Sequence, residues 1–579
     1  MSHTLPEAEI IKRESNYLRG TIAEGLGDLA TGAIADSDNK LTKFHGTYQQ
    51  DDRDLRDERR RQRLEPLHMF MVRLRLPGGV LSPDQWLGLD QIADDCANHT
   101  LRLTTRQTFQ FHGVFKHRMR PLMQAISALG LDTRGACGDV NRNVVSNVNP
   151  HQSQVHADIH RYSVAISERL KWRSNAYAEI WLGEERVEAR GEDQPGQAEK
   201  ADEKEEEPFY GHFYLPRKFK IALAVPPEND ADVLSNDIAL IAIVEDGELK
   251  GFNVGVGGGM GMTYGNEATH PRLADVAGYV PADQVVDACE AIAAVQRDHG
   301  CRTERTHARF KYTIADHGVA WFLERFADYH GAPMEAVRDY VFTHNGDRFG
   351  WVEGENGNQH LTLAIQSGRI ADFDDGYRLR TALREIARVH SGEFRITCNQ
   401  NLIIANVAPE QKAEIQTLVD HYGLDDGSRS TPLARNAMSC VAFPTCALAM
   451  AESERYLPSL TAKLDALMDT HGLADTPINV RVTGCPNGCA RPYLAEIGLT
   501  GKALGKYNLF LGGDARGERM NRLYRENIDE ATILELIDPM LERFAAERND
   551  GEGFGDFLIR VELVDAGRDP EVFHRAYAV

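Results

Sequence analysis

The sequence predicts an α+β fold that is internally duplicated, with mixed or antiparallel sheets flanked by helices and related by pseudo-two-fold symmetry. The chain of 579 residues is too long for one hydrophobic core and predicts several domains. A strand–helix–strand pattern in residues 69–114 occurs again in residues 360–407. Matching residues keep one spacing, because Arg102 and Arg395, Gln107 and Gln400, and Arg142 and Arg435 are each 293 positions apart. A constant offset across several elements indicates internal duplication.

The first copy follows a polar segment, residues 1–65. Alternating apolar residues predict a strand over 69–80 that ends in a Pro-Gly-Gly turn. Ser82, Pro83 and Asp84 are a helix start and predict a helix to about residue 97. Alternation over 101–114 predicts one further strand, with its even-numbered residues on a polar face. A loop over 141–150 and a helix from 155 to about 170 follow.

The second copy repeats this order. It predicts a strand and turn over 360–370, a helix over 379–389, a strand over 394–407 and a loop over 434–446 that runs into a helix. Both copies then end in similar segments, which begin near residues 220 and 479. The offset there drops to about 255, which is consistent with an insertion in the first copy.

These patterns divide the chain into four parts. An N-terminal arm (1–65) precedes two paired half-domains (66–135 and 353–427), a first repeat (136–352) and a second repeat (428–579), which gives three domains around a central site. Residues 184–207 carry eleven acidic and four basic side chains, so we interpret them as a solvated insertion and assign them no function.

Composition narrows the class of protein. The net charge of −22 argues against nucleic acid as a partner. No apolar run approaches the roughly 20 residues that a membrane span needs, and the N-terminus has no apolar signal region. Nine cysteines are too few for a disulfide scaffold and odd in number, which favours a reducing cytoplasm. We therefore expect a cytoplasmic protein with no membrane partner.

Four of the cysteines are arranged like metal ligands. Cys440 and Cys446 form a C-x5-C pair, and Cys485 and Cys489 form a C-x3-C pair, with 38 residues between the two pairs. Four thiolates suit an iron–sulfur cluster or zinc, and C-x5-C is unusual for zinc. The turn between the last two cysteines directs backbone N–H groups inward, as cluster sulfurs require. Buried cysteines brought together by chance are the third reading.

Basic side chains gather in the first copy. They are Arg73, Arg102, Arg106, Arg142, Arg217, Lys218 and Lys220. A polar, basic strand face is either exposed to solvent or needs an anionic partner, and the number of cations favours a polyanionic ligand. The glycine-rich run 255–262 lacks the context of a dinucleotide site, so we expect it to approach either a large flat ligand or a neighbouring strand.

The motifs RLTTRQTFQFHG, NRNV, YLPRKFK, SCVAFPTC and TGCPNGC together resemble the siroheme-dependent sulfite and nitrite reductases. Within that family the likeness is to the hemoprotein (beta) components of assimilatory, NADPH-dependent sulfite reductases. It includes SNYLRGTIAE and FHGTYQQDDRD near the N-terminus and covers nearly the whole chain. The resemblance implies the internally duplicated sulfite/nitrite reductase fold, with siroheme and a [4Fe–4S] cluster as cofactors.

The resemblance also implies roles for individual residues. Cys440, Cys446, Cys485 and Cys489 would bind the cluster, and Cys489 would also be the axial ligand of the siroheme iron. The catalytic cations around sulfite would be Arg73, Arg142, Lys218 and Lys220. The siroheme pocket would be lined by Arg102, Thr104, Thr105, Arg106, Gln110, His112 and Asn487. An asparagine often stands in this family at the position of Thr105, and both side chains donate hydrogen bonds.

The implied activity is the six-electron reduction of sulfite to sulfide. No flavin or nicotinamide motif is present, so electrons would come from an NADPH-dependent FAD/FMN flavoprotein (alpha) subunit, with residues 1–65 as its docking arm. Lys218 or Lys220, crowded by other cations, would have a lowered pKa suited to proton donation. The nearest alternative is a siroheme nitrite reductase that makes ammonia. A non-catalytic protein, such as a siroheme carrier or a metal-stapled scaffold, is the alternative of another class.

Overall fold

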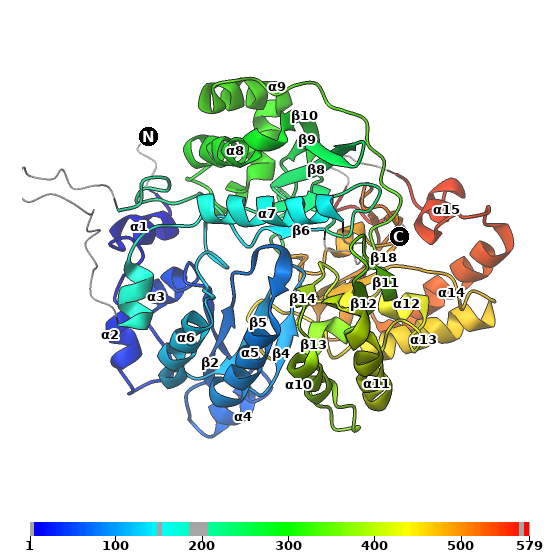
Figure 1. Ribbon diagram of the computed structural model, residues 1–579, viewed down its shortest axis with the longest axis horizontal. Coiled ribbons are helices and arrows are strands. Elements are labelled where there is room, and N and C mark those ends of the chain that lie inside the picture. Colours follow the sequence, from blue (N-terminus) through cyan, green and yellow to red (C-terminus); the bar gives the residue numbers. More distant parts are fainter. Residues whose placement is uncertain (1–4, 148–152, 184–205, 567–572, 578–579) are drawn as a thin grey trace, which may run out of the picture.

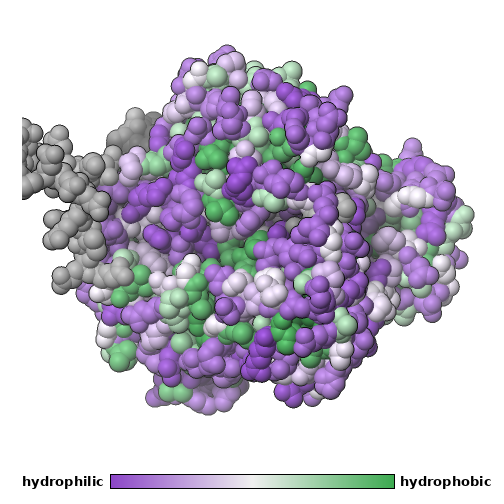
Figure 2. All heavy atoms as spheres, viewed as in Figure 1, coloured by the Kyte–Doolittle hydropathy of each residue, from purple (hydrophilic) through white to green (hydrophobic). Residues whose placement is uncertain are grey.

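The computed structural model describes residues 5–147, 153–183, 206–566 and 573–577, and the acidic insertion lies outside these ranges except for Glu206 and Glu207. Within them the strands form four five-stranded sheets with helices packed around them (Figure 1). The face shown in Figure 2 is mainly hydrophilic, with small separate hydrophobic patches. No helix of the described part is long and apolar enough to cross a bilayer.

Two of the sheets exchange a strand. The first has the order β1 (Thr47–Asp51), β2 (His68–Arg73), β5 (Phe109–Val114), β4 (Leu101–Leu103) and β13 (Arg369–Ile370). The second has the order β11 (Gly350–Glu353), β12 (Gln359–Leu363), β15 (Leu402–Val407), β14 (Glu393–Ile396) and β3 (Val80–Leu81). Each sheet is thus completed by a two-residue strand from the other copy, so neither sheet is complete within its own half of the chain.

Helices cover these two sheets in equivalent ways. They are α5 (Pro83–Cys96) and α6 (Met119–Ala128) in the first copy, and α10 (Leu379–Val389) and α11 (Lys412–Tyr422) in the second. Helix α5 begins at a capping box in which Ser82 and Gln85 bond each other's backbone, as the sequence predicts. Arg380 of α10 binds Asp90 of α5 at 2.6 Å, which joins the two copies through a buried ion pair.

The other two sheets repeat one topology. One contains β6 (Val145–Ser146), β7 (Ile221–Ala224), β8 (Ile238–Glu245), β9 (Glu248–Val256) and β10 (Asp275–Pro281). Its counterpart contains β16 (Met438–Ser439), β17 (Val480–Thr483), β18 (Ile497–Ala503), β19 (Lys506–Leu511) and β20 (Arg522–Ile528). In each, the first three strands are parallel and the last three antiparallel.

The registers refine the offset between these segments. Strands β7 and β8 begin 259 positions before β17 and β18. In the following hairpins Ile241 pairs with Asn253, whereas Thr500 pairs with Asn508, so the offset falls to 255. The predicted value of about 255 therefore holds only after a hairpin that is four residues shorter in the second copy.

The remaining helices flank this pair of sheets or belong to the N-terminal arm. They are α7 (Gln154–Arg169), α8 (Val285–His299) and α9 (Phe310–His330) in the first repeat, and α12 (Pro432–Arg435), α13 (Leu457–Thr470), α14 (Glu530–Glu547) and α15 (Phe554–Arg560) in the second. The arm contains α1 (Glu7–Glu14), α2 (Ile22–Gly27), α3 (Asp36–Leu41) and α4 (Arg56–Arg61). Because β1 is an edge strand of the first sheet, the arm is integrated into the folded body (Figure 1).

Three local predictions are wrong. Residues 101–114 are not one strand but the hairpin β4–β5, and residues 394–407 are likewise the hairpin β14–β15. Gln107 and Gln400 have positive φ values of 51° and 71°, so the chain reverses at a turn that strand periodicity does not reveal. In addition, no helix directly follows residues 434–446, because α13 begins only at Leu457.

The predicted fold class is confirmed: the chain is a duplicated α+β protein with mixed and antiparallel sheets. The predicted domain boundaries stay a prediction. One large apolar core spans both halves of the first sheet pair and the first repeat, and a second core fills the second repeat.

Candidate cofactor and anion site

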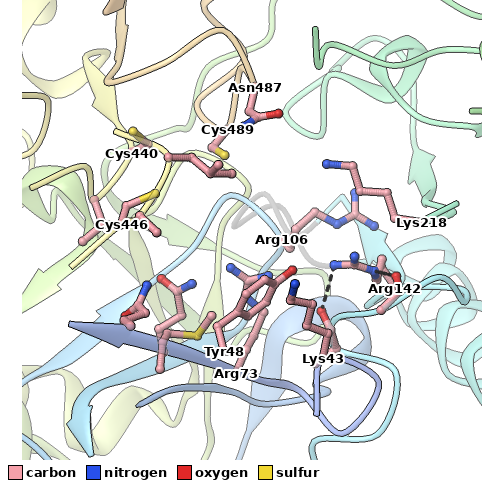
Figure 3. A pocket seen from close by; sticks show the side chains of 18 of the residues that line it. Lys43, Tyr48, Arg73, Arg106, Arg142, Lys218, Cys440, Cys446, Asn487 and Cys489 are labelled. Atoms are coloured by element: carbon pink, nitrogen blue, oxygen red, sulfur yellow. Dashed lines mark hydrogen bonds between the residues drawn. The ribbon is translucent and has the colours of Figure 1, made fainter. Parts of the chain in front are cut away.

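A cavity of about 690 Å³ lies between the duplicated halves. All fifteen site residues predicted from the sequence line it: Arg73, Arg102, Thr104, Thr105, Arg106, Gln110, His112, Arg142, Lys218, Lys220, Cys440, Cys446, Cys485, Asn487 and Cys489. Figure 3 shows Cys440, Cys446 and Cys489 on one side of the cavity, with Arg142 and Lys218 on the other. This volume is in the range of natural cofactor pockets.

A row of polar side chains from the first sheet faces the cavity. Arg73, Gln110 and Arg102 are direct neighbours across β2, β5 and β4, so they lie on one face of the sheet. The hairpin therefore produces the basic face that a single strand was expected to produce.

Arg102 is already paired with a protein carboxylate. Its Nε lies 2.7 Å from Glu454, and Arg369 binds the same carboxylate at 2.6 Å. Although burial raises it, the charges of Arg369 and Arg102 lower the pKa of Glu454 to about 2. Arg102 thus ties the first sheet to the second repeat as well as lining the cavity.

Other polar atoms of this face have no hydrogen-bond partner in the part of the chain that the structure describes. Both ring nitrogens of His112, Oε1 of Gln110 and Nε of Arg73 are buried without a hydrogen bond to any described residue. Burial, and then the charges of Arg369 and Arg102, hold the pKa of His112 well below its usual value, so the ring is neutral. Buried polar groups are nearly always hydrogen-bonded, so this set fits a ligand that carries many polar groups.

The loop 104–108 joins the cavity to both repeats. Thr105 Oγ1 donates to the carbonyl oxygen of Cys489 at 3.0 Å. Arg106 donates to Oδ1 of Asn236 at 2.6 Å and to the backbone oxygens of Asn143 and Ile221. Arg106 therefore fixes the loop to the third sheet, although the sequence suggested only a ligand contact.

The cations opposite the cysteines come from two segments. Arg142 donates from Nε to the carbonyl oxygen of Gly138 at 2.7 Å and from Nη1 to that of Ala136 at 3.4 Å, and it lines the cavity on the side opposite the cysteines (Figure 3). Lys218 and Lys220 lie on either side of buried Phe219, just before β7. Their alternation directs both amines to the cavity that they line.

The two lysines have lowered basicity. Burial and the charges of Arg309 and Arg217 lower the pKa of Lys218 to about 7. Burial and the neighbouring Lys218 hold the pKa of Lys220 well below its usual value. Lys218 is therefore the amine that exchanges a proton near neutral pH.

The four cysteines lie on two loops, at residues 440–446 and 485–489. The amide of Gly484 donates to Sγ of Cys440 at 3.3 Å, and Nδ2 of Asn487 donates to Sγ of Cys485 at 3.6 Å. Burial raises the pKa of Cys440 to about 12, so metal binding must displace its proton. Among the described residues, no three His, Cys, Asp or Glu side chains are grouped for a single metal ion.

The N-terminal arm clasps the first cysteine loop. Arg53 donates from Nη1 to the carbonyl oxygens of Cys446 and Ala449 at 3.0 and 2.6 Å, and its guanidinium lies 4.3 Å from the Phe443 ring centre. Arm residues Lys43 and Tyr48 also line the cavity (Figure 3). Sequence reasoning assigned no site role to these three residues, although Tyr48 and Arg53 lie in the motif FHGTYQQDDRD.

The glycine-rich run packs against the second cysteine loop. A β-carbon on Gly261 would lie 3.2 Å from the carbonyl oxygen of Asn487, and the Met262 amide donates to the Pro486 oxygen at 3.1 Å. Residues 255–262 are not among the described residues that line the cavity. Of the two readings of this run, the close approach to neighbouring protein backbone is the one observed.

At the position that the pseudo-two-fold symmetry relates to the cavity, the chain itself fills the space. Loop 397–401 is the counterpart of loop 104–108, and there the Asp347 carboxylate accepts hydrogen bonds from Thr397, Asn399 and Asn401 at 2.6, 2.9 and 2.8 Å. Asp347 belongs to the segment that links the two copies. This segment also forms backbone hydrogen bonds with Pro227 and Asn229, which are the counterparts of Pro486 and Gly488. The linker between the copies thus lies where the other half has its cavity.

Family models match this chain in both copies. The "Nitrite/Sulfite reductase ferredoxin-like half domain" matches residues 61–129 and again 352–421, and the "Nitrite and sulphite reductase 4Fe-4S domain" matches residues 171–334. The latter match covers the first repeat, and the four cavity cysteines lie outside it.

Curated relatives match over nearly the full length. The chain is 56% identical to the "Sulfite reductase [NADPH] hemoprotein beta-component" of Staphylococcus haemolyticus, over 98% of this chain and 97% of that protein. It is also 56% identical to the protein of the same name from Chromohalobacter salexigens, over 97% and 96%. The solved structure of the Mycobacterium tuberculosis NirA protein is similar, with a TM-score of 0.74 and 24% identity over 96% of this chain and 97% of that one, which supports the fold.

Proposed function

The chain belongs to the nitrite and sulfite reductase family, and on that basis we propose that it is the hemoprotein component of an assimilatory sulfite reductase, which reduces sulfite to sulfide. One observation carries the proposal: four thiols and a set of cations line one cavity from opposite sides. A non-catalytic scaffold has no need for cations facing a metal site.

The cavity residues fit siroheme and a [4Fe–4S] cluster. Cys440, Cys446, Cys485 and Cys489 would hold the cluster, with Cys489 shared with the siroheme iron. His112, Gln110 and Arg73 offer to the polar edge of a macrocycle buried atoms that have no hydrogen-bond partner among the described residues. When bound, the siroheme iron and the coupled cluster supply a binding site for sulfur and a path for single electrons.

The cations of the chain would bind the substrate. Arg73 and Arg142 offer guanidinium groups, which bind oxyanions in a planar fork. Lys218, with a pKa of about 7, is suited to donate protons to the departing oxygens, whereas burial and the neighbouring Lys218 hold the pKa of Lys220 well below its usual value. We therefore assign the proton-donor role to Lys218.

Electrons would come from an NADPH-dependent flavoprotein (alpha) subunit with FAD and FMN. The arm supports this part of the proposal, because Arg53 contacts the loop that carries Cys446, and Ala447 and Leu448 are exposed beside it. Exposed helix α4 follows directly in the sequence. A partner held by the arm would therefore lie next to the first cysteine loop, in the cytoplasm that the cysteine usage predicts.

The test is an anaerobic analysis of the purified protein. We expect iron for one cluster and one siroheme per chain, a siroheme visible spectrum that shifts on sulfite addition, and a higher kcat/KM for sulfite than for nitrite with an artificial electron donor. Cys489→Ser should abolish sulfite reduction, whereas Cys301→Ser, which changes a cysteine outside the cavity lining, should not. A colourless protein, or one that prefers nitrite, would contradict the proposal.

A further inference from the structure

Asp232 and Arg491 are equivalent residues of the two copies, and they bind each other. They are 259 positions apart, which is the offset that relates β7 and β8 to β17 and β18. Both have a left-handed backbone, with φ values of 45° and 53°, and both precede a short 3₁₀ turn (Val233–Ser235 and Pro492–Leu494). Nε of Arg491 lies 2.5 Å from Oδ2 of Asp232. An ion pair between equivalent residues lies on the pseudo-two-fold axis.

The contacts of the guanidinium confirm this position. Nη1 of Arg491 donates to the carbonyl oxygen of Thr105 at 3.4 Å, and Nη2 donates to that of Cys398 at 3.0 Å. Thr105 and Cys398 are 293 positions apart, so they too are equivalent residues. One side chain therefore reaches the same backbone atom in loop 104–108 and in its counterpart, loop 397–401.

The pair is buried and well supported. Asp232 is fully buried and Arg491 is 7% exposed. Asp232 also binds Arg481 at 2.6 Å and accepts from Asn345 Nδ2 at 3.0 Å. A buried carboxylate that bonds this many donors holds its partners in one arrangement.

Arg491 is also joined to Cys489 by short paths. It lies two residues after Cys489, and its amide closes a turn onto the carbonyl oxygen of Gly488 at 3.0 Å. Thr105, whose carbonyl Arg491 binds, in turn bonds the backbone of Cys489 through its hydroxyl. The loop that carries Cys489 and the loop that carries Thr105 are thus held together around the guanidinium of Arg491.

We propose that Arg491, anchored by Asp232, is a positioning residue that sets where Cys489 lies relative to the cavity. The ion pair is asymmetric, because one copy has an arginine where the other has an aspartate. It therefore fixes a unique relation between halves that share one fold. The role of Cys489 as a shared ligand rests on the proposed function, but the positioning of the loop does not.

The test compares Arg491→Lys and Asp232→Asn with Arg380→Lys. Lysine keeps the charge next to Asp232 but cannot reach both carbonyl oxygens. Arg380 forms a similarly buried pair with Asp90 away from the cavity, so its variant controls for loss of a buried arginine. The milder Asp232→Asn keeps the shape of the anchor if Arg491→Lys folds poorly.

Two readouts are used on the full-length purified protein. We expect hydrogen exchange in residues 485–491 and 104–108 to rise at least tenfold in Arg491→Lys and Asp232→Asn, and to stay unchanged there in Arg380→Lys. We also expect altered electron paramagnetic resonance of the coupled cluster and siroheme, at normal iron content, only in the first two variants.

Unchanged exchange in both loops of the first two variants, or an equal change in the control, overturns the positioning role. Absence of siroheme from the wild-type protein would instead overturn the proposed function, while the exchange measurement would still decide the inference.

Discussion

The hydroxyl of Thr105 donates a hydrogen bond to the backbone oxygen of Cys489 at 3.0 Å. The two residues are 384 positions apart and come from different copies. This bond therefore joins the loop of the first sheet to the loop that carries the predicted shared ligand. It makes the geometry of the site depend on how the two halves pack.

Thr105→Val should loosen this junction while preserving shape. Loss of one hydrogen bond of this kind costs about 1 kcal/mol, so cofactor affinity should fall by up to about fivefold, the limit being reached if the bond forms fully only in the holoprotein. Thr105→Asn, which retains a donor, is the control and should bind siroheme nearly as the wild type does. Siroheme content after extended dialysis measures the effect, and equal retention in both variants would contradict it.

Sulfite turnover should fall as pH rises through about 7. Lys218 has a pKa of about 7 in the folded protein, so its amine carries a transferable proton only below that value. Lys218→Met should remove this titration from the profile of kcat against pH with an artificial donor. An unchanged profile in the variant would show that another group donates the proton.

The same lysine should affect stability in the opposite direction. Its pKa is lowered in the folded protein from 10.5, so between about pH 7 and pH 10 the unfolded chain binds the additional proton. Its contribution to the free energy of unfolding therefore rises with pH across that window. Denaturant titrations of wild type and Lys218→Met at pH 6 and pH 9 measure this contribution. If the free energy of unfolding changed equally with pH in both proteins, the prediction would be contradicted.

His112→Leu should stabilise the cofactor-free protein and weaken the holoprotein. Both ring nitrogens are buried without a hydrogen-bond partner among the described residues, and an unsatisfied buried group costs about 1–3 kcal/mol, which an apolar side chain avoids. A bound macrocycle would lose the same polar contact. Thermal melting of the wild type and the variant, with and without siroheme, tests these opposite effects on stability. Destabilisation of both forms would argue against a ligand role for His112.

Arg53→Ala should make the cluster labile. It removes two hydrogen bonds to the carbonyl oxygens of Cys446 and Ala449 and the contact with the Phe443 ring. Arg56→Ala is a matched control, because Arg56 lies on the same segment but pairs with Asp51 at the surface. Iron content after exposure to air should fall faster only in Arg53→Ala. Equal rates in the two variants would show that Arg53 does not stabilise the cysteine loop.

Much of the fold follows from local patterns. The helix start at Ser82, Pro83 and Asp84 and the segment 379–389 predict helices that the structure contains, and the constant offset predicts the duplication. The hairpins at Gln107 and Gln400 do not follow, since strand alternation continues across a turn of polar residues with left-handed backbone. The exchange of β3 and β13 is also absent from the local signal, because a two-residue strand has no periodicity.

The sequence by itself determined which residues carry the chemistry. Four cysteines at ligand spacing and a set of basic residues in one copy are properties of the order of amino acids, and all of them line one cavity. Their individual roles stay predictions. Tertiary structure alone decided that Arg102 pairs with Glu454, that Arg53 clasps the cysteine loop, and that Asp232 meets Arg491. These contacts join residues hundreds of positions apart, and only the packing of one copy against the other brings such side chains within bonding distance.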